Sequence, residues 1–120
     1  MLGAVFLAAP LVFLSYARAD RSIAAVIHKK LEQAGCAVWM DTMLQPGDRW
    51  QLAIEKVMDR SDVVLALIGT PCNTCRDEHH RAHRMGKWIV PVLLRPDANI
   101  PLLLEQFQRM EEDEVTELCK

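Results

Sequence analysis

Residues 11–20, with the sequence LVFLSYARAD, begin as an apolar run of strand-forming residues and end abruptly in small and polar ones. A buried parallel strand reads this way where it opens into a loop at its carboxyl end. Three later stretches repeat the design, at 36–41, 63–70 and 88–95. Ligands of open parallel sheets bind outside the carboxyl ends of the strands, so the polar residues there are the first candidates for chemistry.

Helical patterns separate these predicted strands. After the capping sequence Asp20-Arg21-Ser22, isoleucine or leucine recurs every fourth residue, and Gly35 predicts the end of that helix. A second helix is predicted over 49–60, capped by Asp48, and a polar third over 75–85. Alternating strands and helices with short connections predict an α/β fold, a three-layer sandwich around a central parallel sheet of four to five strands.

The last part of the chain is ambiguous. Pro91 lies inside the fourth predicted strand and favours an edge position or a bulge there. Residues 100–110 read either as a helix or as a turn followed by a short fifth strand near Phe107, and residues 111–120 as an acidic last helix.

Length, charge and the apolar start limit the kind of protein. A chain of 120 residues predicts one domain, and a net charge of −2 excludes a global basic surface for nucleic acid. Residues 1–14 are uncharged, but they are too few for the roughly 20 residues of a membrane span. They also lack the positive start of a secretory signal. We interpret residues 1–10 as an apolar leader of unassigned role and residues 11–120 as the domain. We do not expect the protein to bind a membrane.

The four cysteines are interpreted as reduced thiols of a cytoplasmic protein, since Cys36 lies in an apolar strand where cysteine behaves as a small hydrophobe. Cys72-x-x-Cys75 admits a redox dithiol as an alternative. A zinc site is a further alternative, limited by helix geometry to Cys72, His79 and His83. A solvated helix face explains these residues more simply, so no metal is predicted.

A local basic cluster also falls in and just after the third predicted helix, with histidines between its charges. Its simple interpretation is a solvated helix face, and the alternative is a docking surface for an acidic partner. The cluster comprises Arg76, His79, His80, Arg81, His83, Arg84 and Lys87.

Six blocks, taken in order and spacing, resemble the TIR (Toll/interleukin-1 receptor) domain, especially its bacterial branch. The resemblance covers about residues 11–94, and the last third matches poorly and looks shorter than in a full family member. The blocks are VFLSY with Asp20, VWMD, QPGDRW, SDVVL, CRDE and KWIVPVLL.

The resemblance implies a flavodoxin-like sheet, association with itself or other TIR domains, and possible cleavage of NAD+, as substrate rather than cofactor, to release nicotinamide. It places the catalytic glutamate at Glu78. Where active members commonly carry tryptophan, four residues earlier, this chain has Thr74. The implied substrate-binding residues are Ser15, Tyr16, Arg18, Asp20, Asp41 and Trp50, and the implied interaction loop is Thr42, Met43, Leu44, Gln45, Pro46, Gly47 and Asp48.

The chemistry is consistent with a single carboxylate. Breaking a ribosyl C–N bond develops positive charge at C1′, which a carboxylate stabilises, and cationic nicotinamide needs no acid to leave. Taken without the resemblance, Glu78 reads simply as a residue of the first helical turn. Two further hypotheses stay open: a non-catalytic TIR interaction module in signal transduction, and a receiver-like domain phosphorylated on Asp41.

Overall fold

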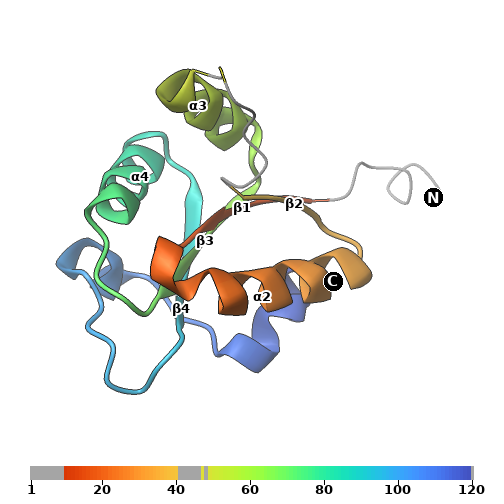
Figure 1. The fold of residues 1–120 in the computed structure, drawn as a ribbon, viewed down its shortest axis with the longest axis vertical. Helices are drawn as coiled ribbons and strands as arrows, with labels where there is room; N and C mark the ends of the chain where they lie inside the picture. Colours follow the sequence, from red (N-terminus) through yellow and green to blue (C-terminus); the bar gives the residue numbers. More distant parts are fainter. Residues whose placement is uncertain (1–9, 41–46, 48, 120) are drawn as a thin grey trace.

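The structure, a computed structural model, describes residues 10–40, 47 and 49–119. Strands and helices alternate along these residues (Figure 1). They are β1 (Leu11–Ser15), α2 (Arg21–Gln33), β2 (Ala37–Trp39), α3 (Trp50–Arg60), β3 (Val63–Ile68), α4 (Asn73–Arg84) and β4 (Trp88–Leu93), with 3₁₀ helices η1 (Arg18–Asp20), η3 (Leu102–Gln106) and η4 (Glu112–Cys119).

The four strands form one parallel sheet in the order β2-β1-β3-β4. β1 pairs with β2 and β3, and β3 also pairs with β4. This is the strand order of flavodoxin-like folds, in which the order reverses beside the first strand. The sequence-based prediction of a parallel α/β sheet is confirmed, with four strands.

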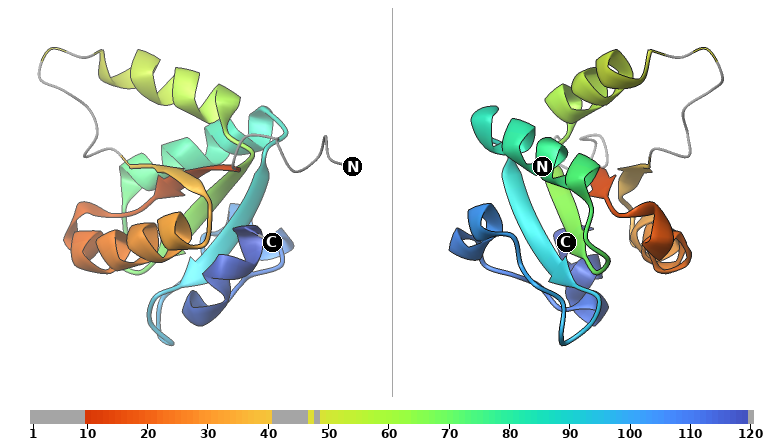
Figure 2. Two further views of the ribbon diagram at one scale, coloured as in Figure 1. Left: turned by 90° about the vertical axis from the view of Figure 1, so that its right-hand side faces the viewer. Right: turned by 60° about the vertical axis from the view of Figure 1, so that its left-hand side comes forward.

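Helices cover both faces of the sheet, as the two turned views show (Figure 2). On β3, Val63, Leu65 and Leu67 point into the core with α2 and η4. The alternating Val64, Ala66 and Ile68 point into the core with α3, α4 and η3. Every residue of β3 is buried, because an internal parallel strand is covered on both faces.

Two element boundaries differ from the sequence-based expectation. α4 begins at Asn73 rather than at Cys75, because the Cys72 thiol sulfur caps the helix and accepts from the backbone N–H of Cys75 at 3.2 Å. At the start of α2, Asp20 is the N-cap residue by position, but its side chain makes no capping bond. Its carboxylate has another partner, described with the site.

Residues 100–110, for which a helix and a turn with a short fifth strand near Phe107 were the two alternatives, form the short helix η3 and a single bridge. Val92 pairs in parallel with Met110, and the backbone N–H of Met110 donates to the Pro91 carbonyl at 2.9 Å. β4 is otherwise the edge strand, which explains how the sheet accommodates Pro91. The predicted last helix is present as η4, anchored by the fully buried Val115.

The cysteines do not all match the expectation of reduced thiols. Cys36 is disulfide-bonded, whereas Cys72 and Cys75 are free.

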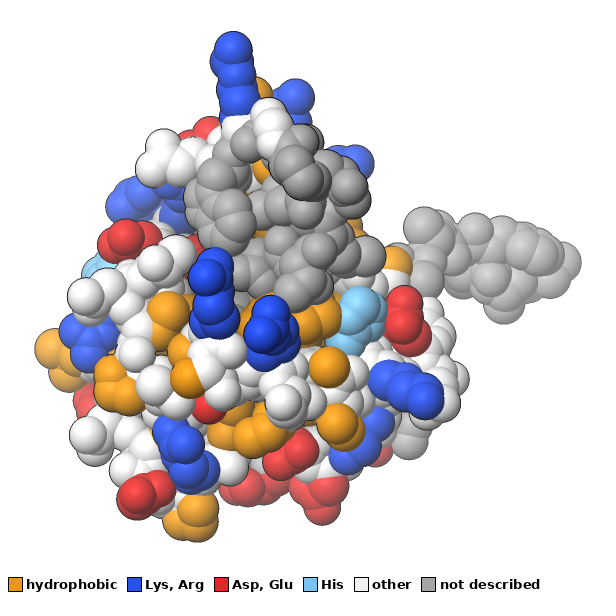
Figure 3. Space-filling view, in the orientation of Figure 1, with side chains coloured by type: hydrophobic (Ala, Val, Ile, Leu, Met, Phe, Trp, Pro, Cys, Tyr) orange, Lys and Arg blue, Asp and Glu red, His pale blue; other side chains and the backbone are white. Residues whose placement is uncertain are grey.

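Within the described ranges, the structure contains no helix of the length and hydropathy that a membrane crossing requires. On the face seen in Figure 1, basic and acidic side chains are interspersed, in keeping with the small net charge (Figure 3).

Candidate active site at the carboxyl ends of the strands

A buried serine joins β1 to α4. Ser15, the last residue of β1, is 1% exposed, and its hydroxyl donates to Glu78 Oε1 at 2.9 Å. Glu78 itself is half-buried on α4. The strand end and the helix, 63 residues apart in sequence, are thus joined at the residue that the sequence marked as the catalytic candidate.

Glu78 lines a cavity of about 200 Å³ outside the carboxyl ends of β1 and β2. Two other predicted site residues, Tyr16 and Arg18, line the same cavity, and so does Thr74, one helical turn before Glu78. The remaining lining residues are Leu14, Trp39, Cys72 and Cys75. The structure therefore brings a carboxylate, a guanidinium and two aromatic rings to one small cavity.

Trp39, the last residue of β2, is only partly buried. Its ring stacks on Phe13, with centroids 5.0 Å apart, and it also lines the cavity. Sequence reasoning missed this residue as part of the site, although its position at the end of β2 was the available signal.

Asp20 does not line this cavity. Its buried carboxylate accepts from the Thr70 backbone N–H at 2.8 Å and from the Thr70 hydroxyl at 3.0 Å. Asp20 therefore ties η1 to the loop after β3, which explains why it does not cap α2.

The other predicted site residues belong to the segment that leads from β2 to α3. Trp50 is the first residue of α3. Gly47 is an exposed turn residue with φ of 91°. Asp41, Thr42, Met43, Leu44, Gln45, Pro46 and Asp48 lie outside the described residues.

His79 is a site residue that sequence reasoning assigned to a solvated face. It is 2% exposed, and its Nε2 lies 3.1 Å from the Ser15 hydroxyl oxygen. Burial, with smaller contributions from His80 and Arg76, lowers the pKa of His79 from 6.5 to about 4. The sequence signal that could have found His79 is its helical spacing from Cys75 and Ala82, which puts the three residues on one side of the helix. In the structure all three are buried along the inner face of α4.

The structure does not favour the two alternative interpretations of the cysteines, a redox dithiol and a zinc site. Burial raises the pKa of the Cys75 thiol well above its ordinary range, and Cys72 and Glu78 add to the effect. A redox-active dithiol needs a lowered thiol pKa instead. No three His, Cys, Asp or Glu residues in the described ranges are grouped to hold a metal ion.

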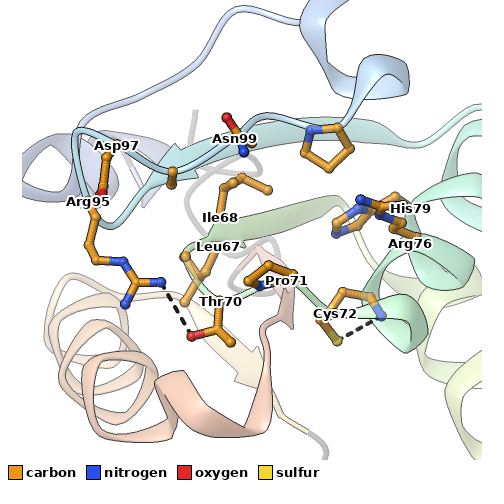
Figure 4. Close-up of a pocket in the computed structure, with 14 residues that line it drawn as sticks. Leu67, Ile68, Thr70, Pro71, Cys72, Arg76, His79, Arg95, Asp97 and Asn99 are labelled. Carbon is orange, nitrogen blue, oxygen red and sulfur yellow. Dashed lines mark hydrogen bonds between the residues drawn. The ribbon is translucent and has the colours of Figure 1, made fainter.

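A larger cavity of about 460 Å³ lies outside the ends of β3 and β4 (Figure 4). Arg76 and Arg95 line it together with Asp97 and the loop after β3. Arg95 donates to the Thr70 hydroxyl at 3.4 Å. Cys72 and Cys75 line both cavities, so the first turn of α4 forms part of the wall of each.

Gly69→Ala is expected to destabilise the fold by about 1–3 kcal/mol, because an added Cβ would lie 2.7 Å from Asp20 Oδ2. The carboxylate cannot move away without losing its bonds to Thr70. Urea unfolding measures the change. In an Asp20→Ala background the same substitution should cost clearly less, and equal costs in both backgrounds would show that the Asp20 contact is irrelevant.

These features together define a parallel α/β domain with a carboxylate-bearing cavity at its strand ends. The chain belongs to the TIR domain family, whose model matches residues 12–117. The match includes the last third of the chain, where the blocks of sequence were least clear. No curated protein sequence matches the chain significantly.

Solved structures with the same fold include the TIR domain of the Toll-related receptor TRR-2 from Hydra magnipapillata, with a TM-score of 0.73 and 21% identity over 90% of each chain. The Clostridium botulinum CMP N-glycosidase BcmB has a TM-score of 0.67 and 20% identity over 90% of this chain and 95% of its own. A 2-deoxyribosyltransferase from Bacillus psychrosaccharolyticus has a TM-score of 0.68 and 12% identity over 90% of this chain and 89% of its own. At these identities the similarity shows the fold alone.

Proposed function

We propose that this TIR domain self-associates and cleaves the N-glycosidic bond of NAD+, with Glu78 as the catalytic carboxylate. One observation carries the proposal: the Glu78 carboxylate lies on the wall of a small cavity at the strand ends and is bonded to a buried hydroxyl. In NAD+ hydrolysis the C1′–N bond breaks and its electrons neutralise the nicotinamide ring. Glu78 would stabilise the positive charge left at C1′.

Water completes the reaction by adding its oxygen to C1′ and releasing a proton to solvent, which gives ADP-ribose. Attack by a group of the ADP-ribosyl unit itself would give a cyclic form. In either case, Arg18 is the cationic side chain among the described residues that line the cavity, and it suits the phosphates of the substrate.

Cavity size supports the role of self-association. Ligand pockets usually measure about 300–1,000 Å³, and this cavity, at about 200 Å³, has room for only part of a dinucleotide. The remainder of NAD+ would extend past the rim, where a second TIR domain can complete the site. The cytoplasm, which contains NAD+, stays the predicted location.

The fold accommodates related chemistry in other proteins. Two solved structures that share it are described as an N-glycosidase acting on CMP and as a 2-deoxyribosyltransferase. They support the choice of reaction class for this chain, while the choice of Glu78 comes from the family resemblance together with the site geometry.

The direct test is nicotinamide release from NAD+ by the wild-type protein at rising concentration, with and without a crowding agent. Release that increases more than in proportion to protein concentration would support both catalysis and self-association. Absence of release in every assembled state, verified by light scattering, would contradict the proposal.

A second candidate function, a non-catalytic TIR interaction module, is favoured by Thr74. This residue is exposed at the cavity rim, so α4 contributes no aromatic ring there. Trp39 and Tyr16 supply aromatic surface from the sheet side instead, which keeps catalysis as the preferred proposal.

Thr74→Trp separates these two candidates. An indole ring at this position would add stacking surface for the substrate, and we expect nicotinamide release to rise about threefold to tenfold. Asn73→Trp is the matched control, because Asn73 is an exposed neighbour that does not line the cavity. Equal effects of the two substitutions would remove Thr74 from the explanation.

A further inference from the structure

The Ser15 hydroxyl has three partners on α4: Glu78, His79 and the Cys75 thiol, whose pKa burial raises and the hydrogen bond with Ser15 lowers to a smaller extent. Its oxygen lies 2.9 Å from Glu78 Oε1 and 3.1 Å from His79 Nε2. Glu78 and His79 are neighbours on α4, whereas Ser15 ends β1. Three residues from two elements therefore form one chain of hydrogen bonds that ends at the candidate catalytic carboxylate.

The number of protons sets the direction of each bond. A serine hydroxyl has one proton to donate, and an ionised carboxylate only accepts. The Ser15 proton therefore goes to Glu78, and the Ser15 oxygen must accept a proton from His79. This requires the proton of the neutral imidazole to be on Nε2, which leaves Nδ1 as the bare nitrogen.

The buried environment of His79 agrees with this tautomer. Nδ1 is buried and has no hydrogen-bond partner in the described part of the chain. An N–H placed there would be a buried donor without an acceptor, which is costly. The cationic form, with protons on both nitrogens, is disfavoured by burial and by the charges of Arg76 and His80, the groups that lower its pKa.

We infer that His79 is a positioning residue for the Glu78 carboxylate, held as the neutral Nε2–H tautomer and acting through the Ser15 hydroxyl. The inference rests on the proposed function, because it assigns the hydrogen-bond chain a role in that reaction. By occupying the acceptor side of Ser15, the imidazole directs the hydroxyl proton to Glu78 Oε1. The carboxylate is thus fixed in one orientation beside the cavity.

The kinetic test compares His79→Leu with His79→Gln in the full chain. Leucine fills similar space but removes the donor, so kcat for nicotinamide release should fall about tenfold with KM nearly unchanged. Glutamine places an amide nitrogen near the former Nε2, so it should restore most of the lost kcat. His83→Gln, at an exposed position one turn further along α4, is the control that should change neither.

Coupling provides a second criterion. Ser15→Ala should lower kcat by a similar factor, and combining it with His79→Leu should add little, because both substitutions break the same chain. If the loss of kcat in the double variant equals the product of the two single losses, the two residues act separately, and this would overturn the inference. So would a His79→Leu variant that folds and keeps the wild-type kcat.

Nitrogen-15 NMR of the His79 ring tests the same hydrogen-bond chain without an activity measurement. We expect a protonated Nε2 and a bare Nδ1 in the wild type, with exchange of the Nε2 proton accelerated in Ser15→Ala. A proton on Nδ1 would overturn the inference even in an active enzyme. If the wild type releases no nicotinamide, the proposed function and the positioning role of His79 in that reaction fail, and the spectra still decide whether the hydrogen-bond chain exists.

Discussion

Nicotinamide release by the Glu78→Gln variant is expected to fall roughly 100- to 1,000-fold below that of the wild type. The substitution keeps the shape of the side chain and leaves a carbonyl oxygen to accept from the Ser15 hydroxyl, so the fold is preserved. It removes the negative charge that would face the developing cation at C1′. The decrease should therefore appear in kcat/KM measured with NAD+ at saturating self-association.

Asp77→Asn is the matched control for this loss of charge. Asp77 precedes Glu78 on α4 and is exposed, so its neutralisation changes the net charge equally without touching the cavity. We expect its activity to equal that of the wild type. If Asp77→Asn and Glu78→Gln lose activity to the same extent, net charge matters rather than the cavity carboxylate. If both retain full activity, Glu78 has no catalytic role.

The free energy of unfolding is expected to decrease by about 3 kcal/mol between neutral pH and pH 4 through His79 alone, with about 2 kcal/mol already lost at pH 5. The cause is the pKa of His79, which is lowered from 6.5 to about 4 by burial. Below pH 6.5 the His79 side chain becomes protonated in the unfolded chain, whereas in the folded protein it stays neutral until the pH falls to about 4. Stability is therefore present above pH 6.5 and declines as the pH falls.

Urea unfolding at pH 7 and pH 5 measures this effect, and His79→Gln provides the comparison because glutamine does not titrate. The variant should lose about 2 kcal/mol less than the wild type over this interval, since carboxyl groups contribute equally to both proteins. An identical pH dependence of the two proteins would mean that His79 titrates near its ordinary pKa, and hence that it is not buried as described.

The fold was predictable because it depends on local patterns. The all-apolar run at 63–68 predicted an internal strand, and that stretch is β3, paired on both sides. Pro91 predicted either an edge position or a bulge for its strand, and β4 is at the edge of the sheet. Residues 100–110 were not predictable in the same way, because their short 3₁₀ helix and single bridge depend on contacts with β4.

The candidate site was predictable where a residue's role follows from its place at a strand or helix end. Strand-end position made Tyr16 and Arg18 candidates, the family resemblance supplied the roles of Glu78, Tyr16 and Arg18, and all three line one cavity. Asp20 was proposed on the same ground, yet its carboxylate binds Thr70, 50 residues away in sequence. A residue at a strand end can serve the site or the loops around it, and sequence position does not distinguish the two.

His79 shows most clearly what only the tertiary structure decided. In the sequence it stands within a run of basic and polar residues, and such a run is usually a solvated face. Packing α4 against β1 turned one side of that helix inward and buried His79 beside Ser15. The amino-acid sequence by itself determined the strands, the helices and the family, because hydrophobic periodicity and local motifs act over a few residues. The tertiary structure decided which polar groups meet, because hydrogen bonds such as Ser15 to Glu78 join residues that are adjacent only after folding.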